Sequence, residues 1–262
     1  METLTGIRPG RVPGRRGEGA ALNEQSWPAD SLFGRLPARI REGVLDLGTT
    51  VTYRARHQVF RQGEESHRVL LLLDGLTKVV VHTESGRPVV LALRGRGDLL
   101  GELLERRHPA NVVTCTPALA KSISGAQLLD FFHRNPDGWA AMAGRLNAQL
   151  RAADARRADF VACPASERVG QALAEIAAAH GVRTQDGWEL QAALTQPEIA
   201  SLAGVALTTC EKALRRLRRS GLVRRRSRRI VVGDLARLTR FGVPERQNPS
   251  QYGVCDPEVP HS

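Results

Sequence analysis

Residues 196–219, QPEIASLAGVALTTCEKALRRLRR, determine how the C-terminal part of this chain folds. Thr195 and Glu198 have the spacing of a capping box, which predicts that a first helix begins here, and Pro197 is tolerated in its first turn. Gly204 is free to take the positive φ of a tight turn. A second helix then carries an apolar face at helical spacing, made of Cys210, Ala213, Leu214 and Leu217. The stretch therefore predicts a helix-turn-helix.

The second helix presents a polar and basic face opposite its apolar one. Small polar groups near its start, followed by cations, suit a helix that lies in the major groove of DNA. An ordinary helix pair with a solvated basic face is the alternative. The residues expected to contact DNA from this region are Thr195, Gln196, Leu207, Thr208, Thr209, Lys212, Arg215 and Arg216.

Residues 222–232, LVRRRSRRIVV, follow and predict a basic hairpin, or wing, that turns at Ser227. Its candidate DNA contacts are Arg224, Arg225, Arg226 and Arg228, which we expect to meet phosphates rather than bases. Residues 164–240 hold 14 Lys or Arg against 7 Asp or Glu, a net charge of +7, and the 262-residue chain carries +11. Because most of the positive charge lies here, double-stranded DNA is the expected partner.

Residues 135–163 predict one long helix that begins at Asn135-Pro136-Asp137 and ends before a hinge at Cys163-Pro164. About 25 helical residues are more than one small domain needs, so we expect this helix to pair with the same helix of a second chain. Packing against the chain's own strands is the alternative. The apolar residues that approximate a heptad seam are Trp139, Met142, Leu146, Leu150, Ala153 and Phe160.

Upstream of the long helix, hydrophobic residues alternate in short runs instead of recurring at helical spacing. Turn pairs such as Asp74-Gly75 and Ser85-Gly86 separate these runs, which is typical of an antiparallel β-sandwich or barrel. A helical lead-in is expected over residues 31–40, and a loop over residues 181–189. The expected strands lie in residues 51–55, 58–60, 69–73, 78–82, 89–93, 112–115 and 118–123.

This order of elements resembles the Crp/Fnr family of bacterial transcription regulators. The resemblance covers about residues 27–240 and rests on Ser31-Leu32-Phe33, Gly63-Glu64, GDLLGEL at 97–103, and the segments quoted above. It implies an α+β fold with an N-terminal antiparallel β-roll of the cyclic-nucleotide-binding type, a long dimerisation helix and a C-terminal winged helix-turn-helix. The implied limits are a disordered basic tail at 1–26, the β-roll at 27–134, the helix and hinge at 135–163, the DNA-binding domain at 164–240 and a loose tail at 241–262.

The same resemblance implies a cytoplasmic homodimer that reads an inverted-repeat operator and has RNA polymerase as a further partner. In family members that bind cyclic AMP, an Arg-Ser pair holds the cyclic phosphate, and His108-Pro109 stand at the matching positions here. Neutral histidine has no fixed charge and proline has no N–H, so cyclic AMP is disfavoured. The residues do not define the effector, and a cyclic nucleotide stays a candidate, although a disfavoured one. The implied effector pocket comprises Gly101, Glu102, Leu103, Arg106, Arg107, His108, Ala153 and Asp154.

Several other classes of function are disfavoured by the sequence. It lacks G-x-S-x-G, P-loop, H-E-x-x-H and paired-cysteine spacings, so we expect neither an enzyme nor a metal site. The iron–sulfur branch of the family uses an N-terminal cysteine cluster, and the first cysteine here is Cys115, so no cluster is expected. Cys163 and Cys210 are either buried inert thiols or redox-reactive ones. Without an apolar run of roughly 20 residues, no membrane partner is expected.

A small-ligand sensor whose helical domain docks a protein is the alternative to a DNA-binding regulator. The wing argues against this alternative, because five arginines within six residues, 224–229, would repel most protein surfaces.

Overall fold

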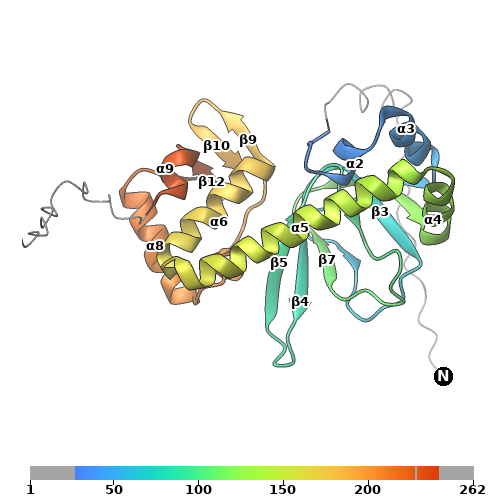
Figure 1. The fold of residues 1–262 in the computed structure, drawn as a ribbon. Helices are drawn as coiled ribbons and strands as arrows, with labels where there is room; N and C mark the ends of the chain where they lie inside the picture. Colours follow the sequence, from blue (N-terminus) through green and yellow to red (C-terminus); the bar gives the residue numbers. More distant parts are fainter. Residues whose placement is uncertain (1–26, 228, 242–262) are drawn as a thin grey trace, which may run out of the picture.

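The computed structural model describes residues 27–227 and 229–241. The two tails expected at 1–26 and, apart from Phe241, at 241–262 lie outside the described residues, as does Arg228. Figure 1 shows one long helix that runs from an N-terminal roll of strands to a C-terminal, mainly helical body. None of the described helices is both long and apolar enough to span a bilayer.

The N-terminal body is a roll of two four-stranded antiparallel sheets, as predicted. The first sheet has the order β1-β8-β3-β6, formed by β1 (Thr49–Tyr53), β8 (Ala118–Ser124), β3 (Arg68–Asp74) and β6 (Leu99–Leu100). The second has the order β2-β7-β4-β5, formed by β2 (Gln58–Phe60), β7 (Asn111–Thr114), β4 (Thr77–His82) and β5 (Pro88–Arg94). A core of alternating residues fills the roll, including Phe60, Leu70, Leu72, Leu100 and Val112.

Strand β3 is buried on both faces, which explains its continuous apolar run. Leu70 and Leu72 face the interior of the roll, while Val69, Leu71 and Leu73 pack under helices. Those helices are α2 (Leu32–Arg35), α3 (Ala38–Asp46) and α4 (Gly125–Arg134).

The single lead-in helix expected over 31–40 is wrong, because the chain forms two helices there, α2 and α3. Leu36, with ψ of 140°, is extended between them. The ring of Pro37 disfavours helical geometry at the preceding residue, which separates the two helices.

Helix α5 (Pro136–Ala162) is 27 residues long and begins and ends where the sequence predicted. Its first turns pack on the roll, where Gly138 lies so close to the Phe132 ring that a Cβ atom would stand 2.2 Å from it. Trp139 meets the same ring edge-on at 5.7 Å between centroids. The helix ends at Ala162, and Cys163 follows in an extended conformation before Pro164.

The C-terminal body packs α6 (Ala165–His180), α7 (Gln196–Ala203), α8 (Leu207–Arg219) and α9 (Leu235–Thr239) around one core. A four-stranded sheet of order β11-β12-β10-β9 flanks these helices. Its members are β11 (Val223–Arg226), β12 (Arg229–Val232), β10 (Gly187–Leu190) and β9 (Gly181–Thr184). The predicted helix-turn-helix and basic wing are confirmed.

The loop expected over 181–189 is wrong, because β9 and β10 form a hairpin there that extends the wing sheet. Trp188 of β10 lies opposite Val232 of β12, and this long-range pairing completes the sheet. The Asp186-Gly187 pair, a frequent hairpin turn, is the sequence signal for it.

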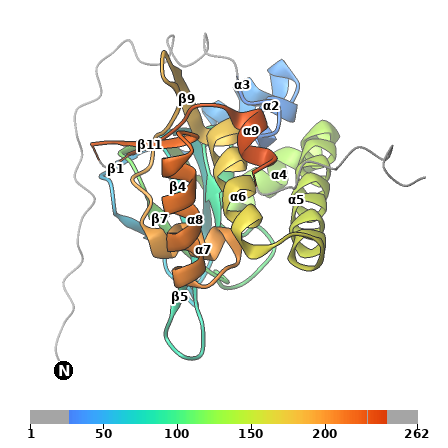
Figure 2. The same cartoon turned by 90° about the vertical axis from the view of Figure 1, so that its left-hand side faces the viewer.

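The two bodies also touch directly, beside the long helix. Leu76 and Leu93 of the roll join the core of the C-terminal body, and the Lys78 ammonium pairs with the Glu198 carboxylate of α7. In Figure 2, β4 and β5 lie behind α7 and α8, in agreement with these contacts.

Candidate functional site

The turn between α7 and α8 has the geometry that the sequence predicted. The Glu198 N–H donates to Thr195 Oγ1 at 3.4 Å, and the Thr195 N–H donates to Glu198 Oε2 at 2.7 Å, which completes the capping box. Gly204 ends α7 in the left-handed region, with φ 59° and ψ 47°. A tight helix pair follows from these local contacts.

Helix α8 buries one face and exposes the other. Cys210, Ala213, Leu214 and Leu217 are buried in the core of the C-terminal body. The exposed residues are Leu207, Thr208, Lys212, Arg215, Arg216 and Arg219, while Thr209 is half-buried. Four of them, at positions 208, 212, 215 and 219, form a row along the helix at the i, i+4, i+7 and i+11 spacing.

The cations of this face differ in their partners. Lys212 and Arg215 form no ion pair with another described residue. The Arg216 guanidinium lies 5.2 Å from the centroid of the Phe241 ring, next to α9. Lys212 and Arg215 are therefore available to an external anion, whereas Arg216 already has an aromatic partner within the chain.

The wing turns at Ser227, which has a positive φ of 53°. Arg226 lies 3.7 Å from Asp186, and Arg229 donates to Glu189 at 2.8 Å, so the β9–β10 hairpin supplies carboxylates to the wing. Arg224 and Arg225 are exposed and form no ion pair within the described residues. Arg228 lies outside the described residues.

The start of α7 is partly covered by the roll. Thr195 is exposed and Gln196 is half-buried. Burial alone would raise the pKa of Glu198, but hydrogen bonds from Lys78 and Thr195 bring it below its usual value. The capping box thus connects the helix-turn-helix to strand β4.

A cavity of about 570 Å³ lies between the roll and helix α5. Apolar side chains make up most of its wall, among them Val79, Leu91, Leu99, Trp139 and Met142. Of the residues predicted for an effector pocket, the structure places four in this wall, namely Gly101, Glu102, Leu103 and His108. Gly101 has a φ of +92°. The Phe60 ring packs closely against it, because a Cβ atom on residue 101 would lie only 3.1 Å from that ring.

His108 occupies the position where the resemblance places a phosphate-binding arginine. It is 5% exposed and stacks on Phe60 at 4.3 Å between ring centroids. Burial is the main cause that lowers the pKa of His108, so the ring is neutral near pH 7. This part of the cavity therefore offers no fixed positive charge to an anion.

The remaining predicted pocket residues lie elsewhere. Arg106 and Arg107 line a separate depression beside Glu65 and His67, and Arg107 donates to the Gly63 carbonyl at 2.7 Å. The part of α5 that lines the cavity extends only to Gln149, so Ala153 and Asp154 do not line it within one chain.

The residues of the predicted dimer seam fall into two groups. Trp139 and Met142 pack on the chain's own roll, which was the alternative reading of this helix. Leu146 and Leu150, in contrast, are 56% and 60% exposed, and Ala153 is half-buried.

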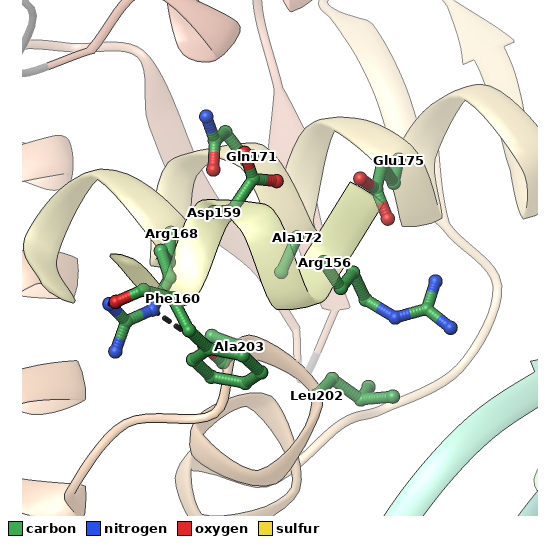
Figure 3. Close-up of a pocket in the computed structure, with 9 residues that line it drawn as sticks. All are labelled: Arg156, Asp159, Phe160, Arg168, Gln171, Ala172, Glu175, Leu202 and Ala203. Atoms are coloured by element: carbon green, nitrogen blue, oxygen red, sulfur yellow. Dashed lines mark hydrogen bonds between the residues drawn. The ribbon is translucent and has the colours of Figure 1, made fainter. Parts of the chain in front are cut away.

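Phe160, the last residue of the predicted seam, packs on the helix-turn-helix (Figure 3). Its ring lies 4.9 Å from the Arg168 guanidinium and fills the space where a side chain on Gly204 would stand. Arg168 also donates to the carbonyls of Cys163 at 3.0 Å and Gly204 at 3.1 Å. Through these contacts, Arg168 connects the hinge at Cys163 to the turn between α7 and α8.

Besides Glu105, three charged cavity residues were not among the sequence predictions for an effector pocket. Arg94, Asp98 and Arg145 line the cavity, and Arg145 donates to Asp98 at 2.7 Å. Asp98 belongs to the GDLLGEL segment, but no local pattern distinguishes Arg94 or Arg145 from the many other arginines.

Comparison with known proteins identifies a family match for each of the two bodies. Residues 50–135 match the family described as cyclic nucleotide-binding domain, and residues 167–241 match the Crp-like helix-turn-helix domain. The CRP-like cAMP-activated global transcriptional regulator of Mycobacterium tuberculosis is 29% identical over 189 residues, which cover 70% of this chain and 84% of that relative.

Two solved structures share the fold. The c-di-GMP responsive global regulator CLP of Xanthomonas campestris superposes with a TM-score of 0.65 at 20% identity, covering 76% of this chain and all of that one. FixK2 of Bradyrhizobium japonicum superposes with a TM-score of 0.62 at 21% identity, covering 73% of this chain and 96% of that one. With its cyclic-nucleotide-binding type of roll and its Crp-like helix-turn-helix, this chain belongs to the Crp/Fnr family of transcription regulators.

Proposed function

We propose that this regulator binds an inverted-repeat DNA operator as a homodimer, in the cytoplasm, and that its effector is not cyclic AMP. The observation that carries the DNA part is the exposed row on α8, in which Lys212 and Arg215 have no ion-pair partner within the described residues. A helix of this kind suits the major groove, and the adjacent wing cations suit the flanking phosphates.

The dimer is supported by α5. Leu146 and Leu150 expose more than half of their surface on one side of a helix whose first turns are already packed on the roll. A second copy of the same helix would cover them, and its two-fold symmetry would place two α8 helices for half-sites about 34 Å apart. The inverted repeat follows from that symmetry.

The effector part rests on His108. The Mycobacterium tuberculosis relative is described as cAMP-activated, but here a buried neutral histidine and a proline stand where a phosphate partner is needed. A charge-assisted hydrogen bond contributes about 1.5–3 kcal/mol, so its absence weakens binding by roughly 10- to 100-fold. Calorimetry of the full chain with cyclic AMP should show no micromolar binding, and a micromolar dissociation constant would contradict this part of the proposal.

Selection of bound sequences from a random pool of double-stranded DNA tests the DNA part. The wild-type chain should enrich an inverted repeat, and the Thr208→Ala, Lys212→Ala double variant should enrich none while keeping the same circular dichroism. If the wild type enriches no sequence and binds a protein instead, the C-terminal body is a protein-docking domain.

A further inference from the structure

The cavity between the roll and α5 is apolar along most of its wall and charged at one place. The charged group consists of Arg94 at the end of β5, Asp98 in the following turn and Arg145 on α5. Residues from three separate parts of the fold thus meet at a single point of the cavity.

Asp98 pairs with one of the two guanidinium groups there, that of Arg145. Asp98 uses both of its oxygens, since Oδ1 accepts from Arg145 at 2.7 Å and Oδ2 accepts from the Gly95 N–H at 3.0 Å. Arg145 Nε is buried and has no hydrogen-bond partner within the described residues. Arg94 donates to the carbonyl of Leu93 and forms no ion pair with another described residue. One positive charge is therefore left without a counterion in a poorly solvated place.

The surrounding groups do not neutralise this charge. Burial lowers the pKa of Arg94; Asp98 opposes this effect, and Arg145 and Arg156 add to it. Burial likewise lowers the pKa of the neighbouring His180, so this ring is a weak source of charge. Glu102 and Glu105 also line the cavity, but they form no ion pair with either arginine. Both belong to the loop after β6 rather than to β5 or α5, which carry the two arginines.

We propose that the effector of this regulator is an amphipathic carboxylic acid. Its carboxylate would lie between Arg94 and Arg145, and its alkyl or aryl body would lie against the apolar wall near Val79, Leu99 and Met142. A carboxylate matches the planar donor geometry of a guanidinium and supplies the missing counterion. An apolar body matches a wall that offers few polar groups to a ribose or a purine. This inference rests on the proposed function, in which the cavity holds the effector.

Calorimetry on the full chain without DNA tests the proposal with four probes: decanoate, 1-naphthylacetate, decanol and cyclic AMP. At least one of the two acids should bind. Whether decanoate or 1-naphthylacetate binds more tightly shows whether the cavity prefers an alkyl or an aryl body. Decanol should bind about 10-fold or more weakly than decanoate, because it has the same chain without the charge.

Variants of the arginines supply the second arm. Arg145→Gln and Arg94→Gln should each weaken acid binding by roughly 10- to 100-fold and leave decanol binding unchanged. Arg151→Gln is the matched control on the same helix, because Arg151 is exposed and does not line the cavity. If the Arg145→Gln variant does not fold by circular dichroism, the double variant Asp98→Asn, Arg145→Gln replaces it. The double variant removes both partners of the ion pair, and its loss of acid binding is then measured instead.

The outcomes separate this inference from the proposed function. Equal binding of decanol and decanoate, acid binding that neither arginine variant weakens, or binding of neither acid would overturn the carboxylate inference even when DNA selection succeeds. Acid binding that depends on the arginines, in a chain that selects no DNA, would support the inference and contradict the proposed function.

Discussion

Replacing Lys212 by alanine tests whether α8 reads base sequence. The ammonium of Lys212 is exposed and pairs with no described carboxylate, so its removal should leave the stability of the fold unchanged. Any loss of DNA affinity then reports the contact with DNA. A lysine that donates to guanine O6 or N7 contributes about 1–3 kcal/mol of discrimination, and the proposed dimer holds two copies, so we expect a loss of about 2–6 kcal/mol on the selected operator.

Fluorescence anisotropy on the selected operator and on a scrambled duplex, over a series of salt concentrations, measures this difference. Arg216→Ala is the comparison variant on the same helix: because its guanidinium stacks on Phe241, we expect a smaller loss of operator affinity than for Lys212→Ala. Arg225→Ala should weaken binding to both duplexes alike and lower the salt slope by about 0.9 for each lost phosphate contact. Equal losses on both duplexes for Lys212→Ala would refute the reasoning and make Lys212 one more phosphate contact.

Three further predictions concern the helix, the capping box and the thiols. Leu150→Asp places a charge on the exposed seam of α5 and should convert the proposed dimer into monomers with weak operator affinity, and a mutant that still sediments as a dimer would place the interface elsewhere. The pKa of Glu198 is lower in the folded chain than in the unfolded one, so its contribution to stability is complete above the unfolded pKa and is lost as pH falls through the folded pKa. Lys78→Ala should therefore reduce the acid sensitivity of the melting temperature, and an unchanged pH profile would count against this link. Burial raises the pKa of the Cys210 thiol to about 11, so Cys210 should react with iodoacetamide near pH 7 far more slowly than the half-buried Cys163, and equal alkylation rates seen by mass spectrometry would show that α8 opens readily.

Structural features that depend only on neighbouring residues were predicted correctly from the sequence. The capping box at Thr195 and Glu198, the left-handed Gly204 and the apolar face of α8 depend on neighbours three or four positions away. The same holds for α5, which begins at Pro136 and ends before Pro164, since proline restricts its own and the adjacent backbone wherever the chain lies. These features identified the helix-turn-helix and its exposed row.

Contacts between distant segments were decided by the tertiary structure. The β9–β10 hairpin gains its place from pairing with β12, which lies more than 40 residues further along. Trp139 and Met142 turn toward the chain's own roll while Leu146 and Leu150 stay exposed, although all four follow one helical repeat. A helical repeat determines which residues share a face, but what covers that face depends on how separate elements pack.

The candidate sites divide in the same way. The sequence alone determined that a basic helix and a basic wing stand in the C-terminal part, because charge and helical period are properties of the local segment. Only the tertiary structure decided that Arg216 stacks on Phe241, and that Arg94 lines the same apolar cavity as the Arg145–Asp98 pair. Arginines are frequent in this chain, and which of them become desolvated depends on how strand β5 and the turn after it pack against helix α5, which is distant in sequence.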